Sequence, residues 1–66
     1  MLITVNSNTR DVTDGTTMLQ LIETLGFGQK RVAVEVNTEL VVKAEWAGHV
    51  LKPGDRVEIV SFVGGG

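Results

Sequence analysis

Three glycines at the end of the chain carry its most reactive candidate group. Gly64, Gly65 and Gly66 close the 66-residue sequence, so the carboxylate of Gly66 would stand at the end of a segment without side chains. Because glycine has no Cβ, such a segment can pass through a channel too narrow for side chains. From Val63 to Gly66, the extended chain would reach at most roughly 13–14 Å. The sequence predicts a folded domain over residues 1–63 and a flexible tail over residues 64–66.

The composition leaves few other groups for catalysis or metal binding. The sequence has no cysteine, which excludes a disulfide, a thiolate nucleophile and a zinc site with cysteine ligands. His49 is its one histidine, and a single histidine in a loop is more typical of a surface residue than of a ligand or a base. A chain of 66 residues buries only about 60% of its unfolded surface, so a deep cleft would consume much of its core. We expect no metal site and no bound cofactor.

Charge and hydropathy exclude two classes of partner. Six basic and eight acidic residues give a formal net charge of −2, which argues against nucleic acid as the main partner. No apolar stretch approaches the ~20 residues that span a bilayer, and no charged segment precedes an apolar one at the N-terminus. We expect a cytoplasmic protein that binds no membrane and is a monomer when free.

The tail must be positioned by strands and a helix, and the first half of the chain predicts three of these elements. Residues 2–5 alternate in hydropathy, residues 6–8 have turn chemistry, and residues 9–12 should return antiparallel as a hairpin. Thr17 and Gln20 then fit a capping box at the start of a helix.

One apolar stripe runs along this helix. Its members recur at helical spacing and are Met18, Leu19, Leu21, Ile22 and Leu25. Such a stripe is far more typical of a core face than of a cofactor site. Gly26 follows it directly, where a left-handed cap would end the helix.

The second half of the chain predicts more strands. Residues 32–36 alternate around three valines, and residues 40–42 form a short apolar run. Trp46 should cover one end of the core. Residues 52–55, Lys-Pro-Gly-Asp, predict a turn before a last strand over residues 56–63.

The last strand has apolar residues on both faces. Val57 and Ile59 share one face, whereas Val60 and Phe62 lie on the other. One helix packed on a mixed sheet of four or five strands, with the first and last strands parallel neighbours, is the economical architecture. It leaves the second sheet face uncovered. Leu2, Val60 and Phe62 are therefore candidate docking residues, although scattered apolar residues are also normal on a surface.

Several segments together carry a family likeness. They are Val34-Glu35-Val36-Asn37, the Leu40-Val41-Val42 run, Trp46, Leu51, the stretch from Gly54 to Val60, and the ending Phe62-Val63-Gly64-Gly65-Gly66. On these residues the chain resembles, over its whole length, the ThiS family of sulfur carrier proteins of thiamine biosynthesis. Pro53 is a departure, because the family often has an acidic residue there, and it should alter the turn without affecting the tail.

The resemblance implies a fold of class α+β, the ubiquitin-like β-grasp. It also implies that an E1-like enzyme of the ThiF type consumes ATP to adenylate the carboxylate of Gly66. A sulfur-relay protein would convert the adenylate to a thiocarboxylate, and a thiazole synthase of the ThiG type would receive the sulfur. Gly64 and Gly65 would thread the tail into these enzymes. The chain would then be a protein cosubstrate with no catalytic residue of its own.

Other uses of the same pattern stay open. The small subunit of molybdopterin synthase also ends in Gly-Gly and carries sulfur, but that family tends to be longer. A ubiquitin-like modifier would join the activated tail to lysines. A plain β-grasp interaction module would have incidental glycines and would keep its function without them.

Overall fold

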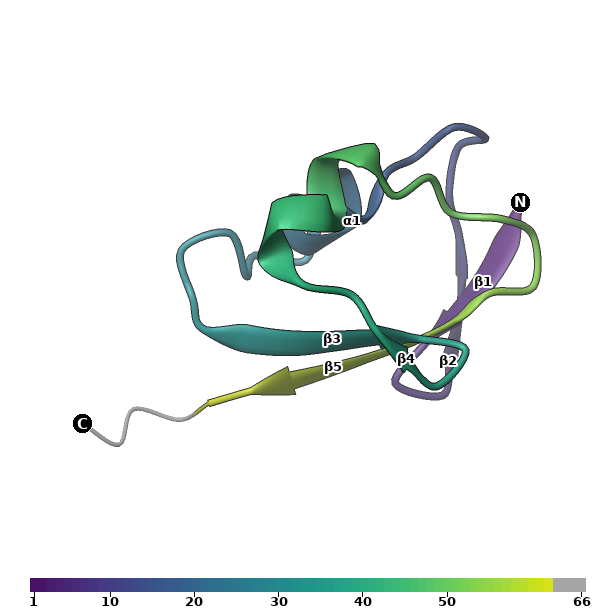
Figure 1. Cartoon of the computed structure of the whole chain (residues 1–66). Helices are drawn as coiled ribbons and strands as arrows, with labels where there is room; N and C mark the ends of the chain where they lie inside the picture. Colours follow the sequence, from purple (N-terminus) through teal and green to yellow (C-terminus); the bar gives the residue numbers. More distant parts are fainter. Residues whose placement is uncertain (63–66) are drawn as a thin grey trace.

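Within residues 1–62, which a computed structural model describes, five strands form one sheet and two helical segments cover one of its faces (Figure 1). The sheet order is β2-β1-β5-β3-β4. The elements are β1 (Leu2–Val5), β2 (Asn8–Asp11), α1 (Met18–Thr24), β3 (Val32–Val36), β4 (Glu39–Leu40), the 3₁₀ helix η1 (Lys43–Gly48) and β5 (Arg56–Ser61).

The first and last strands are parallel neighbours in the middle of the sheet. Thr4 pairs with Arg56 and Val5 with Val57, while the other strand pairs are antiparallel. This mixed sheet with α1 across one face confirms the predicted architecture, and it is the β-grasp arrangement that the resemblance implied.

The two hairpins turn more tightly than the sequence predicted. Asn6 and Ser7 have φ of 48° and 71°, and Asn37 and Thr38 have φ of 52° and 73°. Two successive residues with positive φ make a two-residue turn that matches the twist of the strands. Strand β2 therefore begins at Asn8 and β4 at Glu39, each one residue before the predicted start. The predicted starts at residues 9 and 40 were wrong by that one residue.

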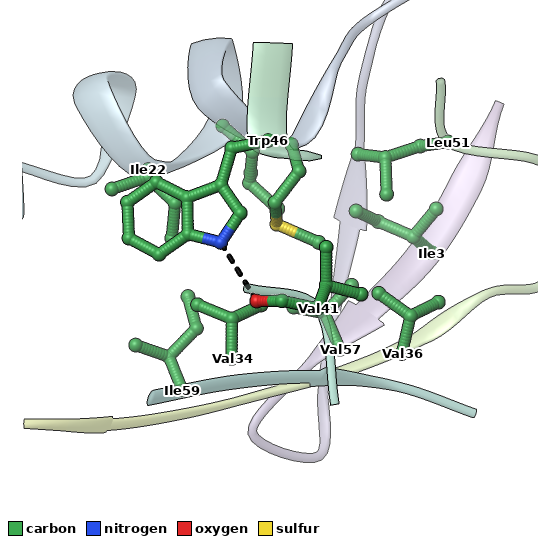
Figure 2. Close-up of a cluster of buried hydrophobic side chains, with 11 residues drawn as sticks. Ile3, Ile22, Val34, Val36, Val41, Trp46, Leu51, Val57 and Ile59 are labelled. Carbon is green, nitrogen blue, oxygen red and sulfur yellow. Dashed lines mark hydrogen bonds between the residues drawn. The ribbon is translucent and has the colours of Figure 1, made fainter. Parts of the chain in front are cut away.

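Strand β4 is also shorter than the predicted range of residues 40–42. Val41 still donates its N–H to the carbonyl of Val34 at 2.9 Å. Its own carbonyl accepts a hydrogen bond from Nε1 of Trp46 at 2.9 Å, and the chain turns there into η1 (Figure 2). The short apolar run thus ends the sheet instead of extending it.

Helix α1 begins and ends as its sequence predicted. Oγ1 of Thr17 accepts from the N–H of Gln20 at 3.2 Å, and Oε1 of Gln20 accepts from the N–H of Thr17 at 2.9 Å. Gly26 has a φ of 86°, the left-handed conformation that stops a helix. No helix within residues 1–62 is long and apolar enough to cross a membrane.

The core lies between the helical segments and one sheet face (Figure 2). Its buried apolar side chains are Ile3, Met18, Leu21, Ile22, Val34, Val36, Val41, Trp46, Leu51, Val57 and Ile59. Trp46 packs on this cluster from η1, which confirms its predicted place over the core.

A buried carboxylate ties the start of β5 to the β3–β4 turn. Asp55 accepts from the N–H of Lys52 at 2.8 Å and from Nδ2 of Asn37 at 3.0 Å. Asn37 in turn accepts from the N–H of Arg56 at 2.9 Å through Oδ1. Gly54 has a φ of 83°, as the predicted turn requires. These bonds satisfy the carboxylate of Asp55, so its role here is structural.

The left-handed conformation of Thr38 gives a prediction about stability. A β-branched residue is strained at positive φ, whereas glycine is not. We expect Thr38→Gly to raise the free energy of unfolding by about 1 kcal/mol, measured by urea denaturation. Thr9→Gly is the matched control, because Thr9 lies exposed in the extended strand β2. There glycine should cost about 0.5–1 kcal/mol, and a loss at both positions would contradict the assigned turn.

Candidate functional site

The last strand separates core side chains from exposed ones by strict alternation. Val57 and Ile59 are 0% and 6% exposed and point to the helices, whereas Val60 and Phe62 are 58% and 60% exposed. This confirms that Val60 and Phe62 stand outside the core. Their role in docking stays a prediction.

Strand β3 holds this end of the chain in place as far as Phe62. Val60 lies opposite Ala33 in the register, and the N–H of Phe62 donates to the carbonyl of Arg31 at 3.1 Å. The two exposed apolar side chains therefore project from a paired strand and not from a loose end.

On the side of β5 that faces β1, the side chain of Asn6 forms the hydrogen bonds that a longer β1 would form. The chain leaves β1 after Val5, and Asn6 is the first residue of the turn. Oδ1 of Asn6 accepts from the N–H of Ile59 at 2.8 Å, and its Nδ2 donates to the carbonyl of Ile59 at 3.1 Å. Sequence reasoning assigned Asn6 only to a turn. An asparagine directly after a strand was the one available signal, and nothing local shows that it reaches a residue 53 positions away.

The uncovered sheet face also carries charge next to its apolar side chains. Glu58 lies directly opposite Glu35, and Leu40, 63% exposed, lies beside Glu35 on β4. Like charges in directly opposed positions destabilise a sheet slightly. Leu40 adds an exposed apolar side chain that sequence reasoning placed in a strand without proposing it for docking.

Leu2 does not join the other two candidate docking residues. It is 58% exposed on the same face, and its carbonyl accepts from the N–H of Gly54 at 2.7 Å. Thr4 pairs with Arg56, so Leu2 lies two residues before that pair and Val60 four residues after it, which separates them by roughly 20 Å along the sheet. The structure therefore brings Val60 and Phe62 together and leaves Leu2 at the opposite end of the sheet.

The residues predicted to be modified and threaded lie outside the described part of the chain. Gly66, with Gly64 and Gly65, follows Phe62 within four positions in the sequence. Val63, assigned to the last strand, lies outside as well. The described structure therefore ends at Phe62, directly after β5, and it shows in which direction β5 runs.

The other candidate sites are groups of polar side chains away from the carboxyl end of β5. Within residues 1–62 no group of three or more His, Asp or Glu side chains is arranged to hold a metal ion. A hollow of about 290 Å³ includes His49, Glu45 and Asp55, and the carboxylate of Asp55 is already bound by backbone and amide donors.

The amino-terminal ammonium lies at the far end of the sheet from Phe62. A hydrogen bond to Oδ1 of Asp11 at 3.1 Å is the main reason why the pKa of the Met1 ammonium is raised above 8.0. The ammonium also donates to the carbonyl of Val12 at 2.7 Å. These bonds hold β1 to β2 and play no part at the carboxyl end of β5.

Comparison with known proteins gives a consistent family. A family model described as the ThiS family matches residues 3–66. The sulfur carrier protein ThiS of Escherichia coli is 29% identical over 66 residues, which is 100% of both chains. A crystal structure of the thiamine biosynthesis protein ThiS from Geobacter metallireducens superposes with a TM-score of 0.84 at 32% identity, again over 100% of both chains.

A larger protein contains a similar segment. A thiazole synthase from Paramagnetospirillum magneticum is 38% identical over 66 residues, which is 100% of this chain. The chain spans only 20% of the length of that thiazole synthase.

The opposite orientations of Ile59 and Phe62 predict opposite costs for the same substitution. Phe62→Asp places a charge at a site that is already in contact with water, so the melting temperature should fall by only a few degrees. Ile59→Asp, the matched control three residues earlier, buries an unpaired charge and should unfold the domain. Thermal melting followed by circular dichroism compares the two. A large fall for Phe62→Asp would assign Phe62 to the core.

Proposed function

The chain belongs to the ThiS family, and we propose that it is a sulfur carrier protein of thiamine biosynthesis whose sulfur is borne by the carboxyl group of Gly66. The observation that carries this proposal is the match, end to end, with a chain named as a sulfur carrier. The glycine ending supports it, because it puts an α-carboxylate on a segment without side chains.

The chemistry explains why such a carrier needs ATP. An α-carboxylate, with a pKa of about 3.3–3.7, is ionised at neutral pH and is a poor electrophile. In the proposed first step one carboxylate oxygen attacks the α-phosphorus of ATP and pyrophosphate leaves. An E1-like adenylating enzyme would bind the phosphates and orient the tail, so this chain need contribute only the carboxylate. The ATP requirement is consistent with a cytoplasmic protein.

The acyl adenylate then accepts sulfur. A sulfide equivalent delivered by a sulfur-relay protein attacks the acyl carbon, AMP leaves with the bonding electron pair, and a thiocarboxylate remains. The chain is in this scheme a cosubstrate, and its partners supply the catalytic groups.

A thiazole synthase is the proposed acceptor of the sulfur. In the Paramagnetospirillum magneticum protein, a segment similar to this whole chain shares one polypeptide with the remainder of a thiazole synthase. Such an arrangement keeps two parts at high effective concentration, which is useful for parts that act together. We therefore propose that the separate chain delivers its sulfur to an enzyme of that class.

Val60 and Phe62 are the proposed contacts that guide the tail to these enzymes. They project together from β5 and the residue that follows it, on the sheet face that no helix within residues 1–62 covers. A partner that buries them would hold the base of the tail in a fixed direction. Leu2, far along the same face, would be at most a separate contact.

Intact mass spectrometry of the protein from thiamine-starved cells tests the proposed function. The expected result is a fraction of the chain with one oxygen exchanged for sulfur, which disappears on treatment that hydrolyses thiocarboxylates. A chain recovered only as the free carboxylate, or as an isopeptide adduct on other proteins, would count against a sulfur carrier of this pathway.

The proposed function depends on the position of the terminal carboxylate. Deletion of Gly66, or addition of a residue after it, should abolish thiocarboxylate formation, because the reacting carbon is displaced by one residue. Folding should be unaffected, since glycine has no side chain that could pack in the core. Mass spectrometry and thermal melting measure the two effects. Normal sulfur loading of an extended chain that is not trimmed would contradict the proposal.

The proposed function also depends on the width of the tail. Gly65→Val adds a branched side chain to a segment that must pass close to enzyme walls, and it also stiffens the backbone. We expect ATP–pyrophosphate exchange by the adenylating enzyme to fall by at least tenfold. Gly48→Val is the matched control, because a Cβ at Gly48 would meet no atom within 4 Å and Gly48 lies in η1. Equal exchange by both variants would remove the argument for a narrow channel.

A further inference from the structure

Strand β5 continues beyond the end of its neighbour β1. Its first contacts on that side are ordinary: the carbonyl of Val57 accepts from the N–H of Asn6 at 2.9 Å. At Ile59 the backbone N–H and carbonyl are both bonded by the side chain of Asn6, at 2.8 and 3.1 Å. The asparagine amide thus takes the place of one further residue of β1, and it reaches no further than Ile59.

The next backbone groups on this side belong to Ser61. In an antiparallel pair, alternate residues direct their N–H and carbonyl toward the partner strand. Phe62 donates to Arg31 at 3.1 Å, so the groups of Phe62 face β3 and those of Ser61 face the β1 side. Among residues 1–62, no backbone or side-chain group forms a hydrogen bond with Ser61 on that side.

The side chains that flank this edge lack the features that usually protect one. Natural sheets blunt exposed edges with charged residues, proline or bulges. Val60, Ser61 and Phe62 carry no charge, and the two apolar side chains are 58% and 60% exposed. On the same side of the sheet, the edge strand β2 has four exposed polar residues that include Arg10 and Asp11. Strand β2 is therefore blunted by polar and charged side chains, whereas the stretch from Val60 to Phe62 is not.

We propose that the backbone N–H and carbonyl of Ser61 pair with an extended segment of the adenylating enzyme, which adds a strand to this sheet beside β5. The proposal rests on the proposed function and names how that partner holds the chain. Strand addition uses main-chain hydrogen bonds for affinity and flanking side chains for specificity, and Val60 and Phe62 provide such side chains. Two hydrogen bonds at Ser61 would fix the direction in which β5 continues, five residues before Gly66.

The adenylating enzyme is the committed occupant because its reaction makes the strictest demand on direction. A carboxylate oxygen must approach the α-phosphorus in line with the leaving pyrophosphate, and misplacement by about 1 Å can cost about a hundredfold in rate. A strand paired with Ser61 restricts the tail at its base, which side-chain contacts at Phe62 alone would do less completely.

Chemical synthesis of the full 66-residue chain allows a direct test. One chain carries an N-methyl group on Ser61, which removes the donor and obstructs strand pairing. A second carries an ester in place of the Ser61 amide, which removes the donor without adding bulk. The matched control carries an N-methyl group on Thr9, whose N–H also faces outward, because Val12 and its alternate neighbours bond to β1.

Binding to the adenylating enzyme is measured by isothermal titration calorimetry, with melting temperatures and sedimentation recorded for each chain. We expect N-methylation of Ser61 to raise the Kd at least tenfold and the ester to raise it about 3- to 10-fold. The Thr9 chain should bind as the unmodified chain does, and all melting temperatures should agree within a few degrees. If N-methylation of Ser61 lowers the melting temperature strongly, that chain is damaged in its fold, and the Kd of the ester chain alone tests the inference.

Each other outcome overturns the inference. An unchanged Kd for the ester chain means that the adenylating enzyme does not use this edge. Self-association of the unmodified chain that methylation of Ser61 abolishes assigns the edge to a second copy, and weaker binding to a thiazole synthase alone assigns it to that enzyme. If the adenylating enzyme neither binds nor adenylates the unmodified chain, the proposed function is wrong, and this inference, which depends on it, is wrong as well.

Discussion

The parallel pairing of the first and last strands is the constraint on which the rest of this structure depends. β1 and β5 lie side by side at the centre of the sheet, although about fifty residues separate them in the chain. A parallel neighbour cannot be reached by a hairpin, so the intervening chain must cross over one sheet face, and α1 and η1 do so. The crossover buries Ile3 and Val57 from the two central strands against the helices. Within residues 1–62, no element covers the opposite face of the sheet.

This asymmetry separates the residues that stabilise the domain from those available for recognition. Along β5, Ile59 belongs to the core and Phe62 to the surface, so a partner can bury Phe62 without disturbing the packing. On the side of β5 that faces β1, the backbone of Ile59 is hydrogen-bonded, whereas that of Ser61 has no partner among residues 1–62. A small domain with few spare residues can in this way offer contacts close to its reactive end while its core stays intact. The proposed carrier function would need little more from the fold, since in that proposal the partner enzymes supply the catalytic groups.

Local patterns predicted much of this structure because they reflect local physics. The capping box at Thr17, the stop at Gly26 and the turn at Gly54 each depend on residues within one turn of backbone, and all three were confirmed. Strand limits were less accurate, because two-residue turns with Ser7 or Thr38 at positive φ run against the usual preference of these residue types. Hydropathy alternation in β5 also placed Val60 and Phe62 outside the core correctly.

The sequence by itself determined the class of fold and the two faces of the last strand. Those properties follow from side-chain type and spacing, which any reader of the chain can see. Only the tertiary structure decided that Leu2 lies far from Val60, that Glu35 faces Glu58, and that Asn6 completes the sheet beside Ile59. Each of these depends on which strands become neighbours and in which register. Register is fixed by the packing of the whole core, and no short segment of sequence contains it.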